Sequence, residues 1–337
     1  MLDVIVEAAR IRIGPRFALT LHRTLRIPDD GRLYPLPPGL GTFPIRRITD
    51  HSERVPAAWR RVGGAFIPMY QREALWLAFH GAAWKPNAVK VAVGGVNALT
   101  GEPDGPELRR EPQNYLVAPL QPWLDGIKSG QGSVRQFVAM PLGQNYTVEA
   151  ALTGQERHGG IQVTVFEPRP GIFPDAPSTE APAPSGPLRS PSPGMGLGAG
   201  GAMRQKVYPD PYGIEAWDPD SIGAVVVHIV DSRRYREVTG EEPPPTPIDA
   251  ATYTASGLPW FDLYDEGRDD IQPSDRLTGA ATIADRDAER GRETGSESVD
   301  IPEPQVKTIT PGPAKDDRGT QPGSSPSTHH ETGGRHG

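Results

Sequence analysis

The aromatic residues of this 337-residue chain stop at Tyr264. The 73 residues from Asp265 to Gly337 contain no Phe, Trp or Tyr, and they hold 15 acidic and 9 basic residues. Such a segment cannot bury enough apolar surface to offset the entropy that is lost when its backbone is ordered. We therefore predict a folded body within residues 1–264 and a disordered, acidic C-terminal tail over residues 265–337, in which residues 278–290 have the pattern of a short helix that is marginal in isolation.

Composition and the alternation of apolar residues favour strands over helices in the body. Pro and Gly together make up 78 of the 337 residues, about twice their average share. In residues 17–22 and 73–80, large apolar side chains recur at every second position, which is typical of a strand with one buried face. Further candidate strands cover residues 89–93, 114–117, 134–140, 145–152, 161–166 and 224–230. We predict a mainly β fold, with an antiparallel β-sandwich or a barrel-like core.

The composition divides the chain into four parts. Residues 1–168 carry most of the candidate strands and form the predicted core domain. Residues 169–203 are rich first in Pro, Ala and Ser and then in Gly, which predicts a linker. Residues 204–264 regain aromatic side chains but contain one clear strand, which is little for an independent domain. We expect this segment to dock on the core domain and either complete its sheet or cover its edge, ahead of the tail at residues 265–337.

Composition also limits the chemistry that the chain can perform. The chain has no Cys, which excludes disulfides, thiolate nucleophiles and Cys-bound metal centres. Its first residues lack the pattern of a secretory signal, and the longest apolar stretch, residues 224–230, is far too short to span a bilayer. We expect a soluble, cytoplasmic protein that has no cofactor and no membrane partner.

Motifs for catalysis or cofactor binding are weak. Residues 196–201 match G-x-G-x-x-G, but a Pro-rich segment precedes them, and Tyr208-Pro209 follows too soon for the helix that a dinucleotide site requires. The sequence has neither a G-x-S-x-G motif nor a P-loop. No two histidines within residues 1–264 lie three to five residues apart, as zinc ligands often do. These patterns do not favour an enzyme.

Two short segments share the pattern Pro, Trp, large apolar residue, Asp. They are Pro122-Trp123-Leu124-Asp125 and Pro259-Trp260-Phe261-Asp262. Each Trp either packs inside, beside a turn that its Asp caps, or anchors a partner at the surface. His158 lies in a polar loop between two candidate strands. We take Trp123, Asp125, Trp260, Asp262 and His158 as the candidate binding surface.

Three hypotheses for the function follow. The first is a non-enzymatic β-sandwich module that contacts another macromolecule, either a different protein or a second copy of itself. The second is a carbohydrate-binding protein or hydrolase, which stacks sugars on Trp123 or Trp260 and uses carboxylates such as Asp125 and Glu149. Residues 1–264 hold 26 basic and 27 acidic residues, so nucleic-acid binding is not favoured in general. The third hypothesis is an anion-binding or nucleic-acid-binding surface formed by Arg10, Arg12, Arg46, Arg47, Arg60 and Arg61.

Overall fold

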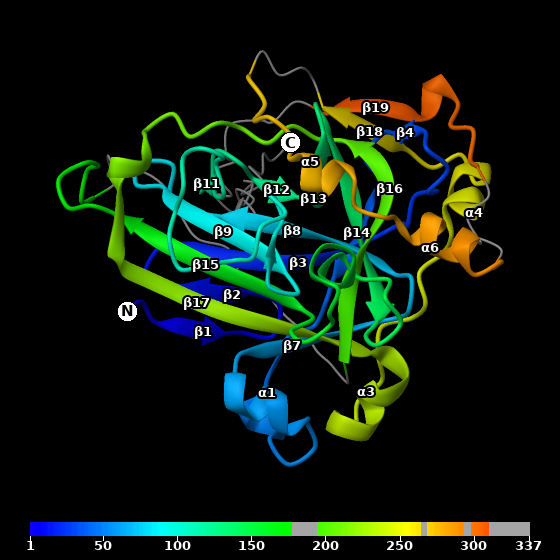
Figure 1. The fold of residues 1–337 in the computed structure, drawn as a ribbon, viewed down its shortest axis with the longest axis horizontal. Helices are drawn as coiled ribbons and strands as arrows, with labels where there is room; N and C mark the ends of the chain where they lie inside the picture. The colour runs from blue at the N-terminus through cyan, green and yellow to red at the C-terminus, as the bar shows by residue number, and fades with distance from the viewer. Residues whose placement is uncertain (177–193, 264–267, 293–297, 310–337) are drawn as a thin grey trace, which may run out of the picture.

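The computed structural model describes residues 1–176, 194–263, 268–292 and 298–309. Over these residues the protein is mainly β, as the sequence predicts, with one large and mostly antiparallel sheet and one small parallel sheet (Figure 1). The longest helix in the described ranges has 8 residues, which agrees with the lack of a sustained helical period in the sequence.

Within the described residues the large sheet contains 17 strands. In chain order these are β1 (Val4–Val6), β2 (Ile11–Ile13), β3 (Phe17–Thr24), β4 (Leu33–Tyr34), β5 (Gly39–Thr42), β6 (Arg46–Arg47), β7 (Ala65–Met69), β8 (Ala74–His80), β9 (Asn87–Val93), β10 (Val96–Asn97), β11 (Leu116–Ala118), β12 (Trp123–Leu124), β13 (Gly126–Gly130), β14 (Ser133–Pro141), β15 (Ile161–Pro168), β16 (Gly194–Arg204) and β17 (Trp217–Asp231). The small sheet pairs β18 (Trp260–Leu263) with β19 (Val306–Ile309). The α-helices of the described residues are α1 (Ala57–Val62), α2 (Val148–Thr153), α3 (Ser232–Thr239), α4 (Ala250–Ala255), α5 (Asp275–Thr278) and α6 (Ile283–Glu289).

Seven strands form a ring around the main core. Antiparallel ladders join β1 to β2, β2 to β3, β3 to β8, β8 to β14, β14 to β16 and β16 to β17. At the end of this path β17 lies beside β1 again, and the Leu2 N–H donates to the Ile222 carbonyl oxygen at 2.7 Å. The architecture is therefore barrel-like, with an incompletely paired seam between β1 and β17. Strands β15 and β9 continue the sheet from the other edge of β17.

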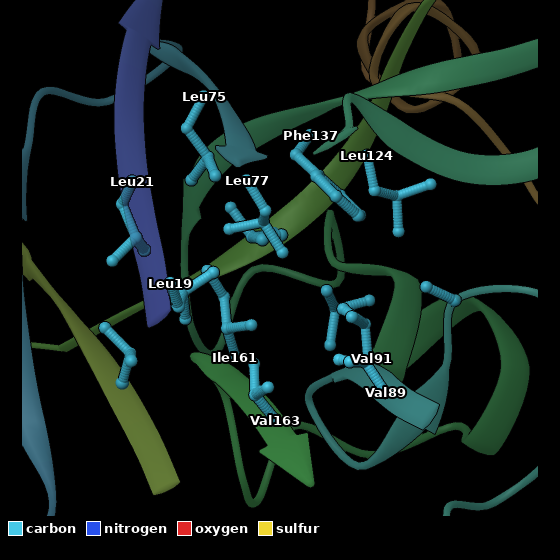
Figure 2. Close-up of a cluster of buried hydrophobic side chains, with 14 of the residues drawn as sticks. Leu19, Leu21, Leu75, Leu77, Val89, Val91, Leu124, Phe137, Ile161 and Val163 are labelled. Atoms are coloured by element: carbon cyan, nitrogen blue, oxygen red, sulfur yellow. The ribbon is translucent and has the colours of Figure 1, made fainter. Parts of the chain in front are cut away.

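The core inside the ring is built from alternate side chains of its strands. Leu19 and Leu77 are 0% exposed, and Figure 2 shows them in one cluster with side chains from β9 and β15. Leu197 of β16 and Val227 of β17 belong to the same cluster. Since the two halves of the chain bury their apolar surface together, they stabilise each other as parts of one core.

The Gly-rich end of the predicted linker takes a different form in the structure. Residues 194–204 do not form a loose linker but continue as β16, which is hydrogen bonded to β14. Strand β17 lies within the large sheet, between β15 and β7, which is one of the two positions expected for the segment at residues 204–264. The Pro-rich residues 177–193 lie outside the described residues.

Glycines in β16 allow close packing. An added Cβ atom at Gly198 would lie 2.9 Å from the carbonyl oxygen of Tyr146 and 3.0 Å from Cγ1 of Ile283. At Gly201 an added Cβ atom would collide with the carbonyl oxygen of Pro28. Only Gly therefore lets α6 and the loop before β4 approach the strand so closely. The G-x-G-x-x-G pattern at residues 196–201 lies inside this paired strand and not at a strand-to-helix turn.

We predict that Gly201→Ala lowers the free energy of unfolding by about 3 kcal/mol, because the new methyl group must displace backbone atoms. Gly105→Ala is the matched control, since nothing lies within 4 Å of its added Cβ atom, and we expect a change of less than about 0.5 kcal/mol. Urea denaturation measures both values. Equal stabilities of the two variants would contradict the packing role of β16.

One predicted strand is wrong. Residues 145–152 are not a strand, because the chain from Val148 onward forms α2. The Thr147 hydroxyl caps this helix by accepting a hydrogen bond from the Ala150 N–H at 3.1 Å. Such a cap satisfies one of the free N–H groups at the start of a helix, and it outweighs the alternation that suggested a strand.

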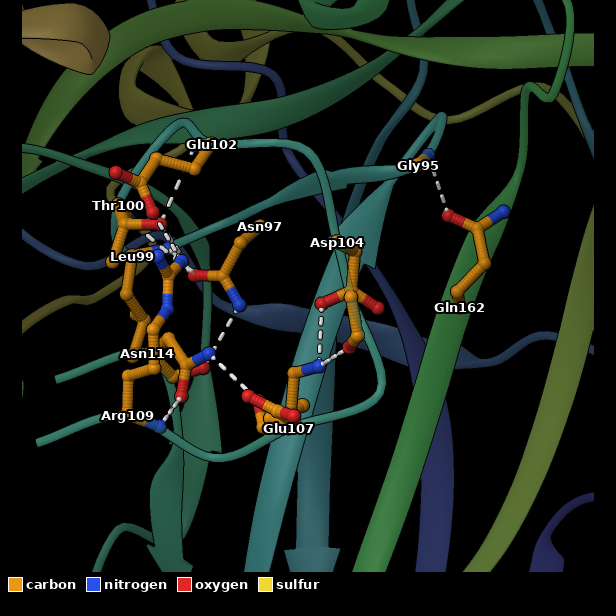
Figure 3. Close-up of polar contacts among 12 residues, drawn as sticks. Gly95, Asn97, Leu99, Thr100, Glu102, Asp104, Glu107, Arg109, Asn114 and Gln162 are labelled. Atoms are coloured by element: carbon orange, nitrogen blue, oxygen red, sulfur yellow. Dashed lines mark hydrogen bonds and ion pairs between the residues drawn. The ribbon is translucent and has the colours of Figure 1, made fainter.

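Polar side chains hold the loop after β9 in place (Figure 3). The Asn97 carboxamide accepts hydrogen bonds from two N–H groups of the following turn and donates to the carbonyl oxygen of Asn114. The buried Lys90 ammonium group pairs with the Asp104 carboxylate at 2.9 Å. Because these partners come from the loop and its neighbouring strands, the loop is part of the scaffold.

The segment after residue 267 differs most from the sequence-based expectation. Residues 268–292 and 298–309, which the sequence assigns to the disordered tail, form α5, α6 and β19. Leu277 of α5 is 0% exposed and belongs to the main core, and Ile283 of α6 is also 0% exposed. Residues 310–337, the remainder of the predicted tail, lie outside the described residues.

Buried ion pairs attach the same segment to the body. The Asp270 carboxylate accepts hydrogen bonds from the Lys128 ammonium group and from the N–H groups of Gly132 and Val207. The Asp287 carboxylate is paired by both terminal nitrogens of the Arg72 guanidinium at 2.7 Å. The segment needs no aromatic core of its own, because it adds single apolar and charged groups to a surface that is already formed.

We predict that Leu277→Ala destabilises the protein by about 2–5 kcal/mol, because it leaves a cavity in the main core. The control is Leu258→Ala, since Leu258 is 41% exposed and its truncation should change stability by less than about 0.5 kcal/mol. Thermal or urea unfolding tests both. Indistinguishable variants would mean that α5 does not pack on the body.

Candidate functional site

The two Pro-Trp-x-Asp segments have different environments. Trp260 of β18 is 0% exposed, and its indole N–H donates to the Thr254 hydroxyl at 3.0 Å. Asp262 forms an ion pair with Arg204 at 2.8 Å. Trp260 therefore has the interior position that was one of its two predicted roles, and its ring is closed to any ligand.

Trp123 and Asp125 lie together at the end of β16. Trp123 is half-buried, whereas Asp125 is 5% exposed. The Gln205 side chain bridges to Asp125, because its amide accepts from the Asp125 N–H at 2.9 Å and donates to the carboxylate at 2.7 Å. Burial raises the pKa of Asp125 to about 7, against the opposing effect of hydrogen bonds from Trp123 and Gln205. Gln205 thus joins Trp123 and Asp125, whereas Asp262 pairs with the preceding residue, Arg204, so the structure brings two of the five predicted residues together here.

His158 and Glu149 lie in another region. His158 is exposed in the loop after α2, and its ring lies over Gly95. The Glu149 carboxylate accepts hydrogen bonds from three successive backbone N–H groups, those of residues 157–159. Because its oxygens already hold this loop, Glu149 is a structural acid, and it shares no contact with Asp125.

The outer face of β8 brings Trp123 together with four side chains that do not belong to the predicted binding surface. Trp123 lies opposite Ala78 on one side of β8, and Thr20 lies opposite Ala78 on the other. Trp76 and His80 precede and follow Ala78 on the same face of the strand, since side chains alternate with a period of two. We call Thr20, His22, Trp76, His80 and Trp123 the aromatic–histidine face.

The members of this face contact one another. The His22 ring stacks on Trp76 with 4.0 Å between ring centroids and an angle of 10°. The Thr20 hydroxyl lies 2.9 Å from Nε2 of His22 and 3.1 Å from Nε2 of His80. Burial lowers the pKa of His22 to about 4, so this ring is neutral at pH 7. The face is therefore pre-organised, with Trp76 and Trp123 half-buried and His80 exposed.

The sequence contains part of the signal for this face. The alternation in residues 17–22 and 73–80 places Thr20 with His22, and Trp76 with Ala78, on the faces away from the core. It does not show that β3, β8 and β12 are neighbours, because register between distant strands depends on the whole sheet.

A cavity of about 450 Å³ lies where the loops at residues 110–115, 209–213 and 270–274 meet. The Asp210 carboxylate at its wall accepts hydrogen bonds from the Tyr115 hydroxyl at 2.6 Å and the Trp217 indole at 2.9 Å. Burial and this hydrogen bond hold the pKa of Tyr115 well above its usual range. Three acids line the cavity, Glu111, Asp210 and Asp270. Because the scaffold holds Asp210 and Asp270, the described residues give the cavity no pair of free carboxylates for acid–base catalysis.

Metal-ligand clusters and unpaired basic surfaces are two further kinds of candidate site. The described part of the chain contains no group of three or more His, Asp or Glu side chains that could hold a metal ion. Arg10 and Arg12 pair with Glu7, and the buried Arg46 pairs with Glu241. Half of the six arginines of the third hypothesis therefore have acidic partners within the chain.

Comparison with known proteins gives no relative. No protein-family model matches the chain, and neither a curated protein nor a solved structure matches it. Within the described ranges, no helix has both the length and the apolar character needed to cross a membrane.

We predict that Asp125 makes stability fall with rising pH. Its folded-state pKa of about 7 exceeds the unfolded value of about 3.9, so the folded state holds a proton that the unfolded state loses between these values. The free energy of unfolding is therefore highest below about pH 4, where Asp125 is protonated in both states. It decreases by up to about 4 kcal/mol as the pH rises to about 7. Asp125→Asn should flatten this part of the stability profile and stabilise the protein at pH 8. Parallel profiles for wild type and variant, measured by urea denaturation, would refute the assignment.

Proposed function

We propose that this protein is a non-enzymatic module that binds another macromolecule through the aromatic–histidine face. The observation that carries the proposal is the clustering of Trp76 and Trp123, both half-buried, with His22, Thr20 and His80 on one face of β3, β8 and β12. Trp residues supply much of the binding energy at protein interfaces, especially when they are held rigidly.

The internal use of the charged groups supports the same proposal. Glu149, Asp210, Asp270 and Asp287 each accept at least two hydrogen bonds from the chain itself. A general acid or base must reach a substrate, and these carboxylates serve the scaffold instead. The rings of the face, in contrast, have surface that a partner can cover.

The carbohydrate-binding or hydrolase alternative has less support. Its two tryptophans do not form a platform, because Trp260 is 0% exposed. Its two carboxylates do not share a site, because Asp125 contacts Gln205 whereas Glu149 contacts the loop after α2. Of the two tryptophans in this hypothesis, only Trp123 remains open to a ligand.

We predict that Trp76→Ala and His80→Ala each weaken partner capture at least about tenfold, as expected when a residue at the centre of an interface is truncated. Affinity capture from a cell extract of the source organism, followed by mass spectrometry, measures the enrichment. Size-exclusion chromatography with light scattering tests a second copy of the chain as the partner.

The matched control is Tyr212→Ala, because Tyr212 is an aromatic residue that is 45% exposed outside this face. It should leave capture unchanged. A monomeric wild-type protein without an enriched partner would count against the proposal, as would equal capture by all variants. Thermal unfolding of each variant shows whether a loss of binding comes from a loss of folding.

A further inference from the structure

We propose that the cavity of about 450 Å³ between residues 110–115, 209–213 and 270–274 binds a small α-amino acid with an apolar side chain. The volume lies within the range of small-molecule sites, which is about 300–1,000 Å³. The residues that line the cavity in the described part of the chain include none of the aromatic–histidine face. The inference therefore goes beyond the proposed function and does not depend on it.

Hydrogen bonds between distant loops fix the wall of this cavity. The Gln113 side chain donates to the Tyr115 carbonyl oxygen at 2.8 Å and accepts from the Asp210 N–H at 2.9 Å. The Ser274 hydroxyl donates to the Thr100 carbonyl oxygen at 2.5 Å. Because these bonds join segments that are far apart in the chain, the wall is formed without a ligand, as in most small-molecule sites.

The turn that carries Arg110 and Glu111 is held at its base. The Arg109 N–H donates to the Asn114 side-chain oxygen at 2.7 Å (Figure 3), and the Asn114 N–H donates to the Arg109 carbonyl oxygen at 3.1 Å. Arg109 also forms an ion pair with Glu102. The backbone at the tip of the turn is therefore fixed, and its two charged side chains are exposed at the cavity.

Arg110 and Glu111 supply free charges of opposite sign. Among the described residues, neither side chain has a hydrogen-bond or ion-pair partner, and the two do not pair with each other. Burial and the hydrogen bond to Asp210 raise the pKa of the Tyr115 hydroxyl, and the charge of Arg110 opposes this rise. The Arg110 guanidinium therefore lies close to the wall that Tyr115 forms.

The two other acids of the cavity differ in their partners. The Asp270 carboxylate is neutralised by the Lys128 ammonium group. The Asp210 carboxylate accepts hydrogen bonds only from neutral groups within the described ranges. Its negative charge therefore remains at the wall and favours a positively charged group of the ligand.

These charges match a zwitterion. A carboxylate can accept two parallel N–H bonds from the Arg110 guanidinium, and an ammonium group can donate to the Glu111 carboxylate while the charge of Asp210 attracts it. Arg110 repels a ligand that carries only a positive charge, and the two acids repel a ligand that carries only a negative charge. An α-amino acid has both groups on one carbon atom, so it can contact Arg110 and Glu111 together.

The rest of the wall selects the side chain of the amino acid. The cavity is also lined by Leu99 and Ile271 and by the rings of Pro112, Pro209 and Pro273. These residues offer nonpolar surface, against which an apolar side chain is removed from water. An uncharged, apolar side chain is therefore preferred.

Isothermal titration calorimetry of the full chain with L-leucine tests the site, and saturable binding is expected. The methyl ester of leucine lacks the carboxylate and N-acetyl-leucine lacks the ammonium group, so each should bind at least about tenfold more weakly. In NMR spectra, L-leucine should shift the signal of the Trp217 indole N–H, which is bonded to Asp210 at the wall. The signal of the Trp260 indole, which is bonded to Thr254 instead, should not move.

Two variants assign each end of the ligand to its residue. Arg110→Gln and Glu111→Gln should each weaken binding of L-leucine at least about tenfold. Arg110→Gln should not weaken binding of the methyl ester, and Glu111→Gln should not weaken binding of N-acetyl-leucine, because each of these ligands lacks the group that the altered residue contacts. Arg233→Gln and Glu53→Gln are the matched controls, since both residues are exposed and neither lines the cavity. The melting temperature of each variant shows that folded proteins are compared.

Failure of the inference differs from failure of the proposed function. No saturable binding of L-leucine, equal affinity for L-leucine and its methyl ester, or full binding by both Gln variants would each overturn the inference. Binding that leaves the Trp217 signal in place would overturn it too, because the amino acid would then lie elsewhere. Trp76→Ala should not change L-leucine binding, and Arg110→Gln should not change partner capture, so each result reports on one proposal alone.

Discussion

The close backbone approach along β16 is the constraint on which the rest of the structure depends. This strand pairs with both β14 and β17, and so it connects two parts of the ring that surrounds the main core. At Gly198 and Gly201 no side chain larger than hydrogen fits against the neighbouring backbone. The packing of α6 on the sheet requires the same small residues, since Ile283 lies against Gly198. A Gly-rich segment that resembles a flexible linker is therefore part of the sheet. Its neighbours pack so closely against it that no residue larger than Gly fits at these positions.

Ring closure also decides which surfaces are available to partners. Inside the ring, alternate side chains of β3 and β8 bury their apolar surface, so the remaining side chains of the same strands face outward and form the aromatic–histidine face. Closure is incomplete between β1 and β17, which leaves two strand edges at the surface. The proposed binding surface is thus a consequence of this topology, because it lies on the outside of the ring.

Buried charges have a supporting role in this arrangement. The Asp270 and Asp287 carboxylates attach residues that follow the last aromatic side chain to a body that is already folded. Their burial is tolerated because each has a cationic partner and further hydrogen bonds. Asp125 is the exception: it has neutral partners only, and burial shifts its pKa to about 7. A segment without aromatic residues is expected to stay unfolded on its own. This segment folds because it packs on the surface of the body.

The sequence by itself determined the mainly β class, the strands at residues 17–22, 73–80 and 161–166, and the face of each strand that is buried. These features follow from local alternation, because a period of two places side chains on opposite faces whatever the neighbours are. It did not determine which strands are neighbours, that residues 194–204 are a strand, that Trp260 is buried while Trp123 is not, or that the chain after residue 267 packs on the body. Only the tertiary structure decided these points, because register, close approach and ion pairing join residues that are far apart in the chain and whose contacts depend on one another.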